Sequence, residues 1–144
     1  MFSSSDGSPQ APAPLPTLID IVAGCLDTPR DKIHPGSRLY ADLGADSLDL
    51  VDILRQIEVR LNVPMDGPER TFLGALASIP PRALAGEDAV RTEWLEPWRQ
   101  VFPGLDAAIS GETVHRAVLK DLITVGALAE LVQARLAART SLAG

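Results

Sequence analysis

The chain has 144 residues, which suits one domain, and its hydrophobic content of 46% is ample for a core. Its net charge of −6 excludes a nucleic-acid-binding surface of the usual kind, because such surfaces need clustered Lys and Arg. Ten acids and five bases fall in residues 1–67, a net charge of −5, whereas nine acids and eight bases in residues 68–144 give −1. The acidic first half is expected to meet basic partners.

The sequence predicts no disulfide, no targeting or membrane-spanning segment and no metal site. Cys25 is the only cysteine, so an internal disulfide is excluded, and its apolar helical context predicts a buried structural thiol. The N-terminus has no basic region followed by a long apolar run, so we expect no signal peptide, no membrane span and a cytoplasmic location. His34 and His115 have no His, Cys or carboxylate at metal-ligand spacing, and no metal site is predicted.

The first elements along the chain are a tail and a helix. Residues 1–16 are rich in Ser, Pro and Ala, and their alternating prolines favour a flexible N-terminal tail ahead of one domain at 17–144. Residues 17–26 are predicted to form a helix whose apolar stripe runs from Leu18 to Cys25. Pro29 follows shortly after, which ends the helix because the residue before a proline avoids helical angles.

The stretch 39–61 reads as a loop followed by an amphipathic helix. Gly44 gives the backbone freedom at the turn, and Asp46 and Ser47 are both good N-cap residues. The acids of the first turns complement the positive end of the helix dipole. The residues that recur at helical spacing and predict a core-facing stripe are Leu50, Ile53, Leu54, Ile57 and Leu61. The sequence therefore predicts a helix at 47–61 with the Ser47 hydroxyl at its N-terminus, where an anion is favoured.

The run Asp-Leu-Gly-Ala-Asp-Ser-Leu-Asp at residues 42–49 resembles the prosthetic-group signature of acyl carrier proteins. The resemblance implies an all-α fold, an antiparallel helix bundle, and a 4'-phosphopantetheine on Ser47 with Asp46 and Leu48 beside it. A second match covers residues 121–136, where Thr124 is the natural N-cap of the family's last helix. Together the two matches cover roughly residues 15–64 and 121–136.

The resemblance also implies roles for other residues. The face that partners recognise would consist of Asp46, Leu48, Asp49, Val51 and Asp52. The pocket for the acyl chain would be lined by Leu54, Ile57, Leu61, Val125, Leu128, Trp94 and Trp98. The implied partners are a phosphopantetheinyl transferase and acyl-transferring or chain-extending enzymes, and the implied oligomeric state is a monomer. Arg55, Val59 and Arg60 depart from the family's usual apolar or acidic residues, which favours a dedicated partner.

Residues 65–120 lie between the two matches, where the family normally has one short helix. A structureless connection of this length is uncommon, so we expect an inserted helical segment. One helical stretch is predicted around Phe72 to Ile79, and further helix is predicted from Leu105 to Leu119. A longer helix is predicted at 87–102, with Val90, Trp94, Trp98 and Val101 on one face. This segment is expected to pack on the bundle, to deepen the acyl cavity or to dock a partner.

The function implied by the resemblance is a carrier and not an enzyme. It would hold acyl intermediates as thioesters on a 4'-phosphopantetheine arm at Ser47, in a specialised fatty-acid, lipid or polyketide pathway. The alternatives are a peptidyl or aminoacyl carrier, and a non-modified protein-interaction module in which Ser47 is a mere cap. A hydrolase with Ser47 as nucleophile is disfavoured, because there is no Gly-x-Ser-x-Gly elbow and neither histidine has a recognisable triad context.

Overall fold

A computed structural model describes residues 14–143, with side chains as far as residue 138. The first helix, α1 (Pro14–Leu26), begins three residues before the predicted start at Thr17. Prolines are tolerated there because the first backbone N–H groups of a helix have no acceptor within the helix. Residues 14–16, predicted as the end of the tail, are therefore helical, and residues 1–13 lie outside the described part of the chain.

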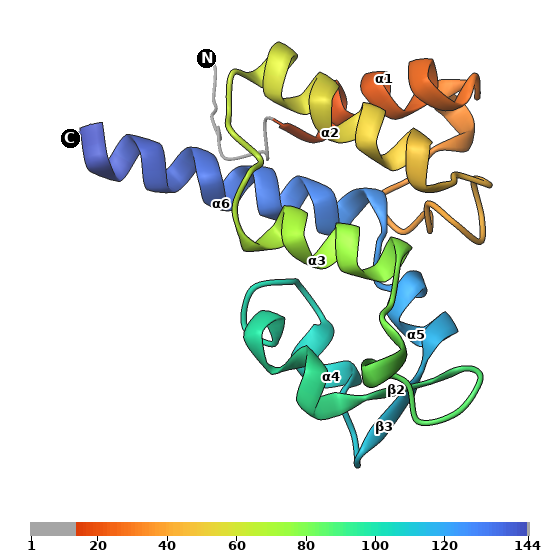
Figure 1. Cartoon of the computed structure of the whole chain (residues 1–144). Helices are drawn as coiled ribbons and strands as arrows, with labels where there is room; N and C mark the ends of the chain where they lie inside the picture. The colour runs from red at the N-terminus through yellow and green to blue at the C-terminus, as the bar shows by residue number, and fades with distance from the viewer. Residues whose placement is uncertain (1–13, 144) are drawn as a thin grey trace, which may run out of the picture.

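Four helices form the bundle: α1, α2 (Ser47–Leu61), α3 (Pro68–Ala77) and α6 (Val125–Ala143). Helix α1 packs against both α2 and α6, and α3 lies between this group and the rest of the chain (Figure 1). The predicted all-α class is confirmed, with the addition of one short pair of strands described below.

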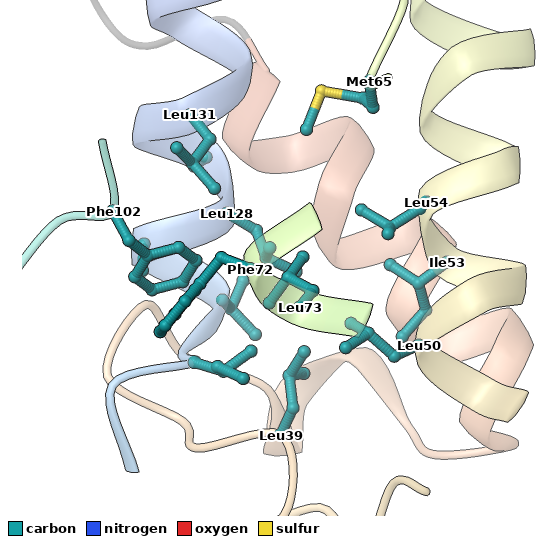
Figure 2. Close-up of a cluster of buried hydrophobic side chains, with 14 of the residues drawn as sticks. Leu39, Leu50, Ile53, Leu54, Met65, Phe72, Leu73, Phe102, Leu128 and Leu131 are labelled. Atoms are coloured by element: carbon teal, nitrogen blue, oxygen red, sulfur yellow. The ribbon is translucent and has the colours of Figure 1, made fainter. Parts of the chain in front are cut away.

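The core stripe of α2 has the predicted phase. Leu50, Ile53, Leu54 and Ile57 are buried, whereas Leu61 at the last turn is half-buried. The helix ends at Asn62, which adopts the left-handed conformation expected of a C-cap. Figure 2 shows Leu50 and Leu54 pointing from α2 towards Leu73 of α3. Apolar burial between α2 and α3 thus fixes both helices on the same core.

The loop before α2 is attached to the start of α6. The N–H of Val125 donates to the carbonyl of Ser37 at 3.1 Å, and that of Gly126 donates to Pro35 at 2.7 Å. The Thr124 hydroxyl accepts from the N–H of Ala127 at 3.0 Å, which confirms its predicted capping role. A Cβ at Gly126 would lie 2.9 Å from the Pro35 oxygen, so only glycine permits this approach. The loop also contains one turn of 3₁₀ helix, η1 (Arg30–Lys32).

Residues 81–121, here called the central segment, form a compact unit below α3 (Figure 1). Its elements are η2 (Pro81–Ala83), β2 (Ala89–Arg91), η3 (Thr92–Trp98), α4 (Leu105–Ala108), β3 (Thr113–His115) and α5 (Arg116–Asp121). Strands β2 and β3 pair antiparallel, with Val90 opposite Val114. The claim that a segment is inserted relative to the family stays a prediction.

The predicted helix at 87–102 is wrong. Residues 89–91 form strand β2 and residues 92–98 form the 3₁₀ helix η3, which contains Pro97. The spacing of the apolar residues suited a helix, but Val90 is buried by pairing with a strand more than twenty residues later. The same pairing makes residues 113–115 extended and leaves only the short helices α4 and α5 from the predicted helical stretch at 105–119.

An aromatic cluster joins the central segment to α3. The ring of Phe72 lies 5.6 Å from Trp98 and 4.9 Å from Phe102, measured between centroids. The ring centroids of Trp94 and Trp98 lie 5.2 Å apart in an edge-on arrangement. The two tryptophans are therefore neighbours, as their spacing of four residues predicted. Phe72 is completely buried, and Figure 2 shows it beside Phe102. Aromatic pairs at these separations stabilise beyond the area that they bury, so Phe72 helps to attach the central segment to the bundle.

Phe72→Ala should lower the free energy of unfolding by about 3–5 kcal/mol, because it leaves a cavity between α3 and the central segment. Urea denaturation followed by tryptophan fluorescence measures this loss, and the emission of the native state should also change because Trp98 loses its neighbour. The exposed Val59→Ala variant is the control and should stay within about 0.5 kcal/mol of the wild type. Equal stability of both variants would contradict the role given to Phe72.

Candidate functional site

The start of α2 is fixed by two aspartates that cap each other's backbone. The Asp46 carboxylate accepts from the N–H of Asp49 at 2.9 Å, and the Asp49 carboxylate accepts from the N–H of Asp46 at 3.0 Å. This is a capping box, in which two otherwise unpaired donors of the helix start are satisfied reciprocally. Of the two predicted N-cap residues, Asp46 takes the position and Ser47 becomes the first residue of the helix.

Ser47 is exposed directly after this cap. The turn before it uses Gly44 with a φ of +71°, as the sequence predicted. Backbone N–H groups in the first turn of a helix have no intrahelical acceptor, and the helix dipole makes this end positive. The Ser47 hydroxyl is therefore accessible, and an anionic group on it would lie where the backbone favours negative charge.

The exposed face of α2 next to Ser47 is both apolar and acidic. Leu48 is 79% exposed and Val51 is 54% exposed, while Asp52 lies on the surface beside them. Asp49 is half-buried because its carboxylate is held by the capping box. Large apolar side chains this exposed on a helix are typical of a contact surface. The five predicted recognition residues thus lie together on the first turns of α2.

A cavity of about 140 Å³ opens beside Ser47, between α2 and α3. Each helix supplies four residues spaced i, i+3, i+4 and i+7, which is the spacing of one helix face. The lining residues are Ser47, Leu50, Val51, Leu54, Arg70, Leu73, Gly74 and Ala77. The wall is mostly apolar, and Arg70 is its one charged side chain.

Leu54 is the one predicted pocket residue that lines this cavity. Ile57, Val125 and Leu128 are fully buried in the core, and Leu61 is half-buried near the end of α2. The other two predicted residues, Trp94 and Trp98, are half-buried in the aromatic cluster on Phe72. They lie outside the cavity because the central segment packs against α3, the helix that forms one of the cavity walls.

Sequence reasoning missed the contribution of α3 to the cavity. The signal was present in the spacing of Arg70, Leu73, Gly74 and Ala77, which share one helix face. Arg70 is held by a long contact, 3.5 Å from its Nη1 to Oε1 of Glu58 in α2. The other oxygen of Glu58 accepts from the N–H of Met65 at 2.9 Å. Glu58 therefore ties the start of α3 to α2.

The comparisons with known proteins agree with this geometry. The family model described as "Phosphopantetheine attachment site" matches residues 16–69. "Acyl carrier protein" of Chlorobium phaeovibrioides is 32% identical over 59 residues, which cover 41% of this chain and 76% of that protein. "Acyl carrier protein 3" of Ralstonia nicotianae is 44% identical over 55 residues, which cover 35% of this chain and 63% of that protein. No solved structure matches the chain.

The fold is a small helix bundle with an exposed serine at the start of α2. The chain belongs to the acyl carrier protein family, whose prosthetic group is a covalently attached 4'-phosphopantetheine. Members of this family are carriers and not enzymes themselves. The alignment with the Ralstonia protein spans 63% of that protein's length, and the matched family region ends before the central segment.

Two other site predictions concern metals and membranes. Among the described residues, no group of three or more His, Cys, Asp or Glu side chains could hold a metal ion. His115 instead caps α5, since its Nδ1 accepts from the N–H of Ala117 at 3.0 Å, and His34 is exposed. No helix in the described range is long and apolar enough to cross a membrane.

Cys25 of α1 lies against the acidic face of α2 and is half-buried, less deeply than predicted. Its pKa is raised from 9.0 to about 11, first by burial, then by a hydrogen bond to Asp52, and further by the charges of Asp52 and Asp49. Each effect disfavours the thiolate. The thiol therefore stays protonated at neutral pH, as expected of a structural cysteine.

Alkylation of Cys25 by iodoacetamide should be slow at pH 8, because a pKa about two units above 9.0 leaves roughly a hundredfold less thiolate than an ordinary thiol has. The rate should rise about tenfold for each pH unit and level off only above the pKa of about 11, whereas the rate of an ordinary thiol levels off near its lower pKa. Asp52→Asn removes the charge and should speed the reaction at pH 8, while urea-unfolded protein provides the rate of an ordinary thiol. A native rate equal to the unfolded rate would refute the raised pKa.

Proposed function

We propose that Ser47 is the attachment residue for 4'-phosphopantetheine and that the protein carries acyl groups for a specialised fatty-acid, lipid or polyketide pathway. The observation that carries the proposal is the exposed Ser47 hydroxyl, which follows the capping box and adjoins an apolar cavity. Membership of the acyl carrier protein family supports the same assignment.

The residues around Ser47 suit a phosphodiester. The N-terminal N–H groups of α2 favour the anion, and the reciprocal capping of Asp46 and Asp49 keeps this helix end ordered. Leu48 leaves the hydroxyl open, since its side chain extends into solvent. When bound, the prosthetic group supplies a thiol on a flexible arm, which holds an acyl group as a thioester.

The cavity beside Ser47 would shelter the cargo between visits to enzymes. Leu50, Leu54 and Leu73 offer apolar contact, and burial is worth about 0.8 kcal/mol for each CH₂ group. A few buried methylenes therefore protect the cargo without preventing its release. This apolar wall favours an acyl cargo over the amino-acid cargo of a peptidyl carrier.

The exposed face of α2 would be the contact surface for a phosphopantetheinyl transferase and for acyl-transferring or chain-extending enzymes. Leu48 and Val51 would enter an apolar depression on the partner, while the carboxylates of Asp46, Asp49 and Asp52 would face basic side chains. Contacts of this kind, few and partly screened by salt, suit brief and repeated encounters.

Protein produced with a phosphopantetheinyl transferase should gain the mass of one 4'-phosphopantetheine, and Ser47→Ala should gain none. The alanine variant should fold normally, because Asp46 and Asp49 supply the cap and the Ser47 side chain is exposed. Intact-protein mass spectrometry measures the modification, and circular dichroism measures the helix content.

Three outcomes of this experiment differ in meaning. Modification of the wild type alone supports the proposal. Modification of Ser47→Ala shows that another residue carries the group. No modification of either protein, under conditions that modify an acyl carrier protein included as a positive control, would favour the unmodified interaction module.

Removing the charge of Asp46 or Asp49 should slow modification by the transferase without unfolding the helix. The test uses Asp46→Asn and Asp49→Asn, because the amide keeps an oxygen that can accept the capping hydrogen bond. Initial rates are measured at low and high salt, and the loss should shrink at high salt. Glu87→Gln, an exposed neutralisation in the central segment, is the control. Unchanged rates for all three variants at low salt would defeat the recognition-face assignment.

A further inference from the structure

We propose that the cargo of this carrier is a short acyl group with an oxygen acceptor near its far end, and that Arg70 recognises this oxygen. The inference rests on the proposed attachment at Ser47. It concerns the size and the polarity of the cavity between α2 and α3, both of which are set by side chains of this particular chain.

The volume of the cavity limits the length of the cargo. A volume of about 140 Å³ corresponds to roughly four or five groups of the size of a water molecule or a methylene, each taking about 30 Å³. Fully buried core residues lie behind the lining, with Ile53 and Phe72 completely inaccessible. The space between the helices thus suits about four carbon atoms.

Arg70 lies at the end of the cavity opposite Ser47. A helix rises 1.5 Å per residue, so Leu54 is roughly 10 Å beyond Ser47 along α2, and Glu58 is roughly 16 Å beyond it. Arg70 contacts Glu58, which places its guanidinium near the Leu54 end of the cavity. A cargo that entered beside Ser47 would therefore meet apolar side chains first and a cation last.

The guanidinium of Arg70 has more N–H donors than its contact with Glu58 uses. It carries five N–H groups, and the one contact found for it in the described part of the chain is the 3.5 Å approach of Nη1 to Glu58. Glu58 makes a shorter bond to the N–H of Met65. Arg70 is also partly exposed, so its charge remains hydrated until an acceptor arrives. An oxygen on the cargo can replace water there and form a charge-assisted hydrogen bond.

Gly74 keeps the cavity open from the α3 side. It lies within a helix, where glycine is unfavourable, yet a Cβ built on it meets no atom within 4 Å. A larger residue at position 74 would therefore fill the cavity without a clash against the backbone. Such a substitution also favours the helix, so it blocks the cargo site while keeping or raising the stability of the fold.

The experiment loads the wild-type protein at Ser47 with different acyl groups, using a phosphopantetheinyl transferase and the CoA thioesters. The probes are acetyl, butyryl, acetoacetyl, succinyl and octanoyl groups. The first readout is the rate of cleavage by hydroxylamine, divided by the rate for the same acyl group on free pantetheine. The second readout is the melting temperature, because a cargo bound only by the folded state stabilises that state.

Butyryl should be protected more than acetyl, and octanoyl no more than butyryl. At least one of acetoacetyl and succinyl should be protected roughly tenfold more than butyryl, because it adds a hydrogen bond to a charged group. Preference for succinyl identifies the acceptor as a carboxylate, and preference for acetoacetyl identifies a neutral carbonyl oxygen.

Three variants separate recognition from folding. Arg70→Met should remove the advantage of the oxygenated groups over butyryl, with all groups compared on the same variant. Gly74→Leu should remove the protection of every group while its unloaded form melts no lower than the wild type. Glu58→Gln breaks the ion pair but keeps an acceptor for the N–H of Met65, and it should leave the oxygen preference in place.

Protection that increases up to octanoyl, or an oxygen preference that survives Arg70→Met, would overturn the inference and leave the carrier function standing. Equal protection of all groups would show that the cavity holds no cargo, and would overturn it as well. Failure of the wild type to gain the prosthetic group, read by mass before any cleavage, would instead refute the proposed function on which the inference rests.

Discussion

The reciprocal hydrogen bonds between Asp46 and Asp49 hold Ser47 at the start of α2. They satisfy two backbone donors where the loop ends, so the helix begins at Ser47 and places its hydroxyl at the positive end of the helix. The rotation of α2 about its axis is set by the buried stripe of Leu50, Ile53, Leu54 and Ile57. With this rotation Leu48 and Val51 are exposed and Ser47 lies at the cavity. The same two carboxylates thus fix the helix and supply charge to its exposed face.

Local patterns were sufficient to predict what is encoded within one element. The bounds of α2, the capping by Asp46 and Thr124, and the end at Asn62 depend on residues within a few positions of each other. The exposed positions of Leu48 and Val51 follow from the same periodicity. Such features can be predicted because local hydrogen bonds and side-chain spacing determine both the sequence pattern and the structure.

Features that depend on distant partners were not predictable in this way. Val90 and Trp94 fit a helical stripe, but the pairing of β2 with β3 brings together residues more than twenty positions apart. No local period contains that information, and Pro97 fits the 3₁₀ helix that resulted. The cavity was missed for a related reason, because it arises where the faces of α2 and α3 meet, and neither face identifies it alone.

Helix α3 takes part in both the cavity and the packing of the central segment, because its opposite faces make different contacts. Arg70, Leu73, Gly74 and Ala77 face α2 and form one wall of the cavity. About half a turn away, Phe72 carries the aromatic cluster of the central segment, and buried Glu69 contacts Arg135 of α6 at 3.4 Å. The position of this cavity wall therefore depends on the contacts of Phe72 and Glu69, which are made by residues outside the cavity lining. In a close-packed interior a displacement of Phe72 cannot be absorbed locally, so packing in the central segment determines how far α3 stands from α2.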